Sequence, residues 1–426
     1  MKSFINKLTK KKFIRNVVVV VTGTASAQAI TVIFSPFITR LYGPEAFGVL
    51  GVFMAMVSII GPVSALTYPI AIVLPKRDSE AKVLIFLSIF ISFIIAMIIG
   101  IILMIFNKPL VYLLQIAEIA QYLFLIPLVI IFTTFLQVSR QWLIRTKQFK
   151  VTAKAAFINS LILNISKTGI GLFNPVASVL VTLNTFSNAF HAFLLSINSI
   201  KTKIKPKKIT IKISVLKNIA NKYNDFPLYR APQTLVHVVS QSLPIILLSA
   251  FFGPAAAGYY SLSRSVLAMP ITLIGESVGD VFYPRIVEAE KKRENLALLI
   301  TRATLGLGLV GLIPFGIIII FGPWLFGLIF GADWVVAGEY ARWLTLGFYF
   351  GFINRPSARA IPVLNIQKQF LIYEIISGFI RGGILLLGFF LFENDVVAVA
   401  LFSISTVLLN TYLIFFTIRK AVLYKN

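Results

Sequence analysis

A few basic side chains interrupt long apolar segments of this chain, where a charge is costly. Arg264, Lys167 and Arg381 lie inside such segments, and Arg40 and Arg342 lie nearer to segment ends. An ionised side chain in a bilayer costs about 2.5–3.5 kcal/mol on insertion scales, so each is a candidate binding group. Because guanidinium and ammonium groups bind phosphate oxygens well, these five residues predict a site for an anionic ligand.

Four of these five cations also have a simpler structural explanation. Arg264 could pair with an acid on a neighbouring helix, and Arg381 could pair with Glu374, two turns before it. Arg40 and Arg342 could extend to the membrane interface instead of contacting a ligand. The residues alone leave these alternatives open.

Acidic side chains within the apolar segments are fewer than basic ones. Glu276 and Asp280 lie one turn apart near the inner end of their segment, and Glu374 lies in another segment. These three carboxylates are the candidates for coupling transport to a proton or sodium gradient. Glu276 and Asp280 could instead pair with Arg285 and nearby lysines. Cysteine is absent and only two histidines occur, so we expect no metal or other cofactor.

The composition is that of a membrane protein. Of the 426 residues 58% are hydrophobic and only 13% are charged, whereas a soluble domain has roughly 25% charged residues. Twelve segments are long enough to span a bilayer and lack the alternation of a membrane barrel, so we predict twelve transmembrane α-helices. They are residues 16–40, 46–74, 83–106, 120–143, 151–173, 175–199, 224–251, 256–284, 297–322, 335–363, 370–392 and 396–418.

The distribution of charge predicts how the spans are oriented. With the N-terminus in the cytoplasm, most of the 40 Lys and Arg residues fall in inward loops and ends, and outward loops carry acids such as Glu45 and Asp395. This is the positive-inside pattern, and it places both termini in the cytoplasm. The net charge of +25 therefore indicates contact with anionic membrane lipids rather than with nucleic acid.

A repeated motif predicts two halves. Tyr42–Gly48 reads YGPEAFG, and Phe252–Gly258 reads FGPAAAG between a similar pair of apolar segments. We predict a six-helix lobe over residues 1–200, a basic cytoplasmic linker over 201–222 and a second six-helix lobe over 223–426. Six spans per lobe give a parallel repeat, related by an axis along the membrane normal. Such lobes can rock and expose a cleft to each side in turn.

Three runs of the sequence resemble a known family. They are Ile38–Gly48 (ITRLYGPEAFG), Tyr68–Lys76 (YPIAIVLPK) and Tyr259–Arg285. They resemble polysaccharide repeat-unit flippases, the Wzx-type O-antigen transporters, within the group that also holds multidrug and toxin extruders and lipid II flippases. The resemblance covers the whole chain in length, span count and division into lobes.

The resemblance implies a MATE-like fold and a transporter rather than an enzyme. The implied cargo is an undecaprenyl-pyrophosphate-linked oligosaccharide, which is flipped across the bacterial plasma (inner) membrane for O-antigen, lipopolysaccharide or other surface polysaccharide biosynthesis. The implied partners are this lipid-linked substrate, membrane lipids, and a polysaccharide polymerase with its chain-length machinery. Arg264 lies where lipid II flippases carry an arginine on span eight, which implies a substrate contact there.

Two other functions fit parts of the pattern. A cation-coupled multidrug or toxin extruder has the same architecture, but the first six predicted spans lack a deep acid for a cationic drug. A membrane polymerase or ligase usually has a large outward loop, and the outward loops here are short.

Overall fold

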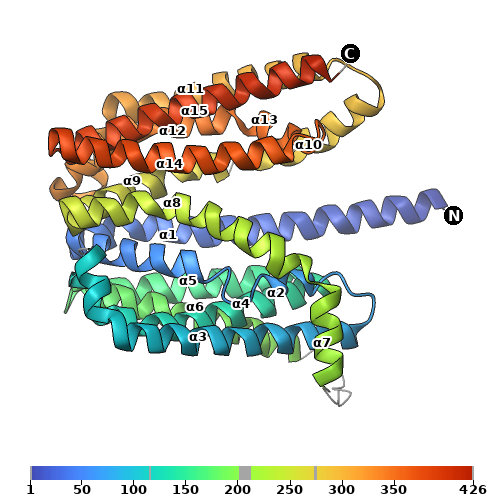
Figure 1. The fold of residues 1–426 in the computed structure, drawn as a ribbon, viewed down its shortest axis with the longest axis horizontal. Helices are drawn as coiled ribbons and strands as arrows, with labels where there is room; N and C mark the ends of the chain where they lie inside the picture. Colours follow the sequence, from blue (N-terminus) through green and yellow to red (C-terminus); the bar gives the residue numbers. More distant parts are fainter. Residues whose placement is uncertain (1, 115–116, 201–212, 273–275, 425–426) are drawn as a thin grey trace. The chain divides into compact units, whose positions relative to one another are not determined.

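Helices form the described part of the chain. The computed structural model describes residues 2–114, 117–200, 213–272 and 276–424, and no β-strand occurs among them (Figure 1). This confirms the all-α prediction, which follows from apolar runs whose backbone groups must bond within their own segment. The chain divides into two compact units. Unit 1 comprises Met1–Tyr42 with Val52–Ser242, and unit 2 comprises Gly43–Gly51 with Leu243–Asn426.

Unit 1 begins with α1 (Lys2–Ile60), which bends at Gly43, where the chain enters unit 2 before returning. Helix α4 packs against both α3 and α6, and α5 packs against α6. The predicted boundaries at residues 200 and 223 stay predictions. The further elements are α2 (Tyr68–Ala71), α3 (Asp78–Leu114), the 3-10 helix η1 (Ala117–Leu125), α4 (Ile126–Arg145), α5 (Phe149–Gly171), α6 (Ala177–Ile200), α7 (Ile213–Lys222), the π-helical turn η2 (Phe226–Arg230) and the first part of α8 (Ala231–Phe252).

The short helix α7 is tied to one end of unit 1. Its buried Ile219 joins an apolar cluster with residues of α2 and α3. Lys222 Nζ donates to Glu80 Oε2 at 2.7 Å, and this hydrogen bond raises the pKa of Lys222 above its usual value. Tyr68 donates its hydroxyl proton to the carbonyl of Ala220 at 3.2 Å. The part of the predicted basic linker that is described is thus a helix packed on unit 1, and residues 201–212 lie outside the described residues.

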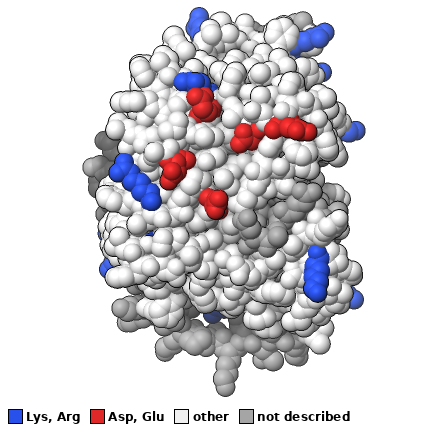
Figure 2. Space-filling model, turned by 90° about the vertical axis from the view of Figure 1, so that its left-hand side faces the viewer, with Lys and Arg blue, Asp and Glu red and all other residues white. Residues whose placement is uncertain are grey.

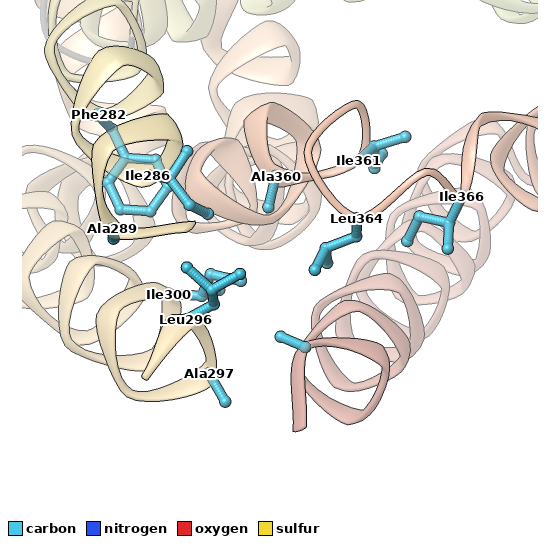
Figure 3. Close-up of a cluster of buried hydrophobic side chains, with 11 residues drawn as sticks. Phe282, Ile286, Ala289, Leu296, Ala297, Ile300, Ala360, Ile361, Leu364 and Ile366 are labelled. Carbon is cyan, nitrogen blue, oxygen red and sulfur yellow. The ribbon is translucent and has the colours of Figure 1, made fainter. Parts of the chain in front are cut away.

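Unit 2 is organised around α12. This helix lies against α9, α11 and α15, and α15 also packs along α14. Figure 3 shows side chains of α10, α11, α13 and the turn after α13 converging on one buried cluster at an end of the unit, including Ile286, Ile300, Ala360 and Leu364. The elements are α9 (Pro254–Pro270), α10 (Glu276–Lys291), α11 (Leu296–Phe330), the 3-10 helix η4 (Ala332–Trp334), α12 (Val335–Ile353), α13 (Arg355–Ala360), α14 (Gln367–Phe392) and α15 (Asp395–Leu423).

Acidic side chains mark the opposite end of unit 2. Glu45, Asp333 and Asp395 all lie within electrostatic range of the Tyr259 hydroxyl, near the start of α9. Tyr340 donates its hydroxyl proton to Asp395 Oδ2 at 2.7 Å. Figure 2 shows acidic side chains gathered near the middle of one face of the molecule. Glu45 and Asp395 belong to the outward loops that the charge pattern predicts.

Eight helices of the described part are long and apolar enough to cross a membrane, by length and composition. The predicted span 16–40 and residues 46–60 of the next predicted span lie on the two sides of the non-helical Gly43 in α1, which ends at Ile60. Three further predicted spans, 151–173, 256–284 and 335–363, are not among the eight, and each is either rich in polar side chains or divided into shorter helices. The chain is therefore a multi-pass membrane protein, and the number twelve stays a prediction. The eight are Ala25–Ile60, Asp78–Pro109, Ile119–Arg145, Ala177–Ile197, Phe226–Phe252, Leu296–Phe330, Gln367–Phe392 and Asp395–Leu423.

Candidate functional site

Two of the predicted cations come together in unit 2. Arg264 is on α9 and Arg381 is on α14, and both interact electrostatically with the hydroxyl of Tyr260. The Tyr260 side chain is buried and packs edge-on against Phe402 of α15, with ring centroids 6.5 Å apart. Both arginines therefore place positive charge within electrostatic range of one buried tyrosine.

Arg381 retains an unused donor in this setting. Its Nε is buried without a hydrogen-bond partner, and no carboxylate among the described residues lies within ion-pair distance of it. Glu374 interacts with Arg381 electrostatically. A buried guanidinium N–H without a partner costs about 1–3 kcal/mol or more, so a ligand oxygen there would be strongly favoured.

Lys167 lies in unit 1, on α5. Its Nζ donates to Asn184 Oδ1 of α6 at 3.3 Å, and no described carboxylate is within ion-pair distance. The Lys167 carbonyl accepts a hydrogen bond from the Tyr42 hydroxyl at 2.8 Å. A Cβ on Gly171 would lie only 2.6 Å from the Tyr42 ring, so glycine there permits this contact.

A polar stripe on α5 continues from Lys167 and was missed by the sequence reasoning. Asn164 donates to the Ser160 carbonyl at 2.7 Å, and Ser160 donates its hydroxyl proton to the Ala27 carbonyl of α1 at 2.7 Å. Asn159 donates to Ser187 of α6 at 3.0 Å. Polar side chains of this kind join helices in lipid. The signal was available, because residues three and four apart share one face of a helix.

The remaining predicted residues are placed differently. Arg342 donates from Nε to the Ile319 carbonyl at 3.0 Å and from Nη1 to Glu339 Oε2 at 3.1 Å, so its charge is balanced within its own helix turn. Arg40 is an exposed residue on α1 in unit 1. The substrate-binding roles predicted for both stay predictions.

The predicted coupling residues Glu276 and Asp280 lie on α10, one turn apart. Their side chains fall outside the described part of the chain. Glu374, the third candidate, lies on α14 beside the Arg381 charge.

The sequence identifies the family directly. Residues 37–339 match a family described as "Polysaccharide biosynthesis protein", and this range is well over half of the chain. The chain belongs to this family. The predicted resemblance to Wzx-type flippases is thereby confirmed. A comparison with curated protein sequences gives no match.

Solved structures show that this member of the polysaccharide biosynthesis family has a MATE-like fold. An inward-facing multidrug resistance MATE family transporter of the MOP superfamily gives a TM-score of 0.72 at 14% identity, covering 94% of this chain and 99% of that chain. The lipid II flippase MurJ in an inward closed conformation gives a TM-score of 0.70 at 16% identity, covering 94% of this chain and 89% of that chain. A MOP superfamily transporter from Pyrococcus furiosus, described as having a binding pocket of reverse polarity, gives a TM-score of 0.57 at 14% identity, covering 96% of this chain and 96% of that chain.

The family and the structural neighbours are transporters and flippases. The prediction that the chain is a transporter rather than an enzyme is confirmed by its family. At these low identities the solved structures establish the fold alone, whereas the family match connects the chain with polysaccharide biosynthesis.

Proposed function

We propose that this chain is a flippase for undecaprenyl-pyrophosphate-linked oligosaccharide repeat units. The observation that carries the proposal is the pair Arg264 and Arg381 around Tyr260, with a buried guanidinium donor of Arg381 unused. A pyrophosphate offers several charged acceptor oxygens, and charge-assisted hydrogen bonds to arginine are the strong ones. Lys167 supplies a second buried cation in unit 1. The family description supports a saccharide cargo.

The cargo moves by alternating access from the cytoplasmic to the outer leaflet of a bacterial plasma (inner) membrane, with both chain termini in the cytoplasm. Twelve spans in two six-helix lobes provide the path. The product is O-antigen, lipopolysaccharide or another surface polysaccharide, and a polymerase with its chain-length machinery receives the flipped unit. Coupling to a proton or sodium gradient would use Glu276, Asp280 or Glu374, because these carboxylates can exchange a cation near the membrane interior.

A second candidate function is a cation-coupled multidrug or toxin extruder. The fold likeness to MATE transporters favours it. The positive charge of the arginine pair in unit 2 disfavours it, because Arg264 and Arg381 would repel a cationic drug. The two functions therefore require cargoes of opposite charge.

Loss of the gene separates these two functions. We expect the deleted strain to lose surface glycan and to accumulate lipid-linked repeat units on the cytoplasmic leaflet, with unchanged sensitivity to cationic dyes. Glycan blots, thin-layer analysis of extracted lipids and dye-sensitivity assays measure these outcomes. Intact surface glycan together with increased dye sensitivity would replace the flippase proposal with the extruder.

The variant Lys167→Met should lower glycan display about tenfold at equal protein level. The change removes a cation worth roughly 1.5–3 kcal/mol in a charged hydrogen bond and keeps an unbranched side chain in the helix. Lys154→Met is the matched control, because Lys154 is an exposed residue of the same helix. Equal display by both variants would remove Lys167 from the substrate path.

A further inference from the structure

An apolar groove runs along α14 and α15 within unit 2, and its lining extends to Ile380, next to Arg381. It has a volume of about 440 Å³, and residues of these two helices line it, among them Phe370, Tyr373, Ile376, Tyr412 and Phe416. That volume is within the range of roughly 300–1,000 Å³ that small-molecule sites occupy. The Ile376 and Tyr412 side chains are half exposed, at 51% and 59%. Unit 2 thus has an open apolar groove on two helices that are each long enough to span a membrane.

Four aromatic rings form a continuous stack along this groove. The centroids of Phe370 and Tyr373 are 6.1 Å apart, those of Tyr373 and Tyr412 6.2 Å, and those of Tyr412 and Phe416 6.0 Å. All three pairs are near parallel, with interplanar angles of 23°, 20° and 19°. Tyr373 donates its hydroxyl proton to the Leu409 carbonyl at 2.9 Å, which fixes its ring. The stack is a preformed surface for a long apolar chain rather than for a compact polar ligand.

A cationic end distinguishes this groove from ordinary lipid-exposed surface. Lys420 Nζ lies 5.7 Å from the centroid of the Phe416 ring, the last ring of the stack. Lys368 is in the first turn of α14, next to the lining residue Gln369. An occupant that complements both features has an anionic head at the lysines and an apolar chain along the rings.

We propose that this groove is the loading site for the isoprenoid chain of a polyprenyl-phosphate-linked substrate, with the phosphate at Lys420 and Lys368. The inference rests on the proposed function and on the proposed orientation of the chain in the membrane. That orientation places the start of α14 and the end of α15 at the cytoplasmic face. A lipid of the inner leaflet has its phosphate at that face and its chain directed toward the bilayer centre. Arg381 is thirteen residues beyond Lys368 on α14, about 20 Å at 1.5 Å per residue. One helix thus carries the loading site and, deeper in the membrane, a cation of the arginine site.

The test is photo-crosslinking of purified full-length protein to undecaprenyl phosphate with a benzophenone on its chain, in phosphatidylcholine nanodiscs. We expect Ile376→Trp, which fills the groove, and Lys420→Glu, which reverses the charge at its mouth, each to lower crosslinking at least tenfold. Phe415→Ala is the matched control on α15, because Phe415 is 72% exposed and does not line the groove. Melting temperatures in detergent verify that all three variants are folded.

The possible outcomes separate the site from the cargo assignment. Crosslinking by Ile376→Trp at the level of the unchanged protein would overturn the groove proposal. Equal displacement of the probe by phosphatidylglycerol would also overturn it, since the groove would then hold any anionic lipid. Retained crosslinking in Arg264→Ala and Arg381→Ala would support a loading site separate from the arginines. Because the assay measures binding to purified protein, it does not depend on whether the gene deletion alters surface glycan.

Discussion

Replacing Arg381 with alanine is expected to abolish surface glycan while leaving the protein in the membrane. The buried Nε of Arg381 has no hydrogen-bond partner, so this donor contributes no hydrogen bond to the fold. In the substrate complex its guanidinium would gain charge-assisted hydrogen bonds worth roughly 1.5–3 kcal/mol each. Losing two such bonds lowers affinity by a factor of about 100 or more.

Arg264→Ala should have a similar effect, because both arginines act on the same position around Tyr260. The double variant should be little worse than either single one, since groups that share one ligand are not additive. Arg381→Lys keeps the charge but loses the planar fork, so we expect partial display.

The measurement is glycan display at equal membrane level of each variant, by blotting of surface polysaccharide and of tagged protein. Arg302→Ala serves as the matched control, because Arg302 is an exposed arginine on α11. Full display by Arg381→Ala and Arg264→Ala together would show that the cargo does not use these cations. Loss of the protein from the membrane would instead assign them to folding.

The fold class could be predicted from the sequence because its determinants are local. Apolar runs of spanning length must form helices or closed barrels, and these runs lack barrel alternation. The positions of the helix ends were predicted less accurately than the fold class. The predicted span 46–74, for example, runs past the end of α1 at Ile60 and into the separate short helix α2.

The candidate site was predicted in part, for an electrostatic reason. A buried charge is visible in a sequence as a break in an apolar run, which identified Arg264, Arg381 and Lys167. The partners of these groups come from other helices, so Asn184 and Tyr260 required the tertiary structure. The same is true of Arg342, whose pairing with Glu339 depends on side-chain direction as well as spacing.

The aromatic groove was invisible in the sequence for a different reason. Its rings belong to two helices, and aromatic residues are common throughout this chain, with 38 Phe and 14 Tyr. Only the packing of α14 on α15 shows that four of them stack in order.

The second large effect is expected at the two repeated glycine-proline turns. Gly43 has φ 67° and ψ 175°, and Gly253 has φ 86° and ψ 173°, so the two turns share one backbone geometry that favours glycine. Each glycine is followed by a proline that opens the next helix, as expected for proline in the first turn. Both turns belong to unit 2.

Further glycines bring these two turns into direct contact. A Cβ on Gly48 would lie 1.7 Å from the Pro254 carbonyl oxygen, and a Cβ on Gly258 would lie 2.0 Å from the Pro44 carbonyl oxygen. The contact is reciprocal, since each turn supplies one glycine and one proline carbonyl. Because the obstructing atoms are backbone, no side-chain rotation can relieve the clash.

We therefore expect Gly48→Ala and Gly258→Ala each to destabilise the protein by about 3 kcal/mol or more, at the upper end of what overpacking costs. Thermal unfolding in detergent, followed by tryptophan fluorescence and by membrane abundance, measures the loss. Gly306→Ala is the matched control, because nothing lies within 4 Å of a Cβ at that helical position. Removing a helical glycine there should be neutral or stabilising by up to about 1 kcal/mol.

Substitution at these glycines also tests whether the two turns must separate during transport. If Gly48→Ala folds at reduced temperature and still displays glycan, the close contact serves stability alone. If Gly48→Ala folds and glycan display is lost, the turns take part in the transport cycle. The added methyl group would then keep the two turns apart, so that they could not form their contact at the step of the cycle that needs it. Unchanged stability in both Gly48→Ala and Gly258→Ala would contradict the reciprocal backbone contact itself.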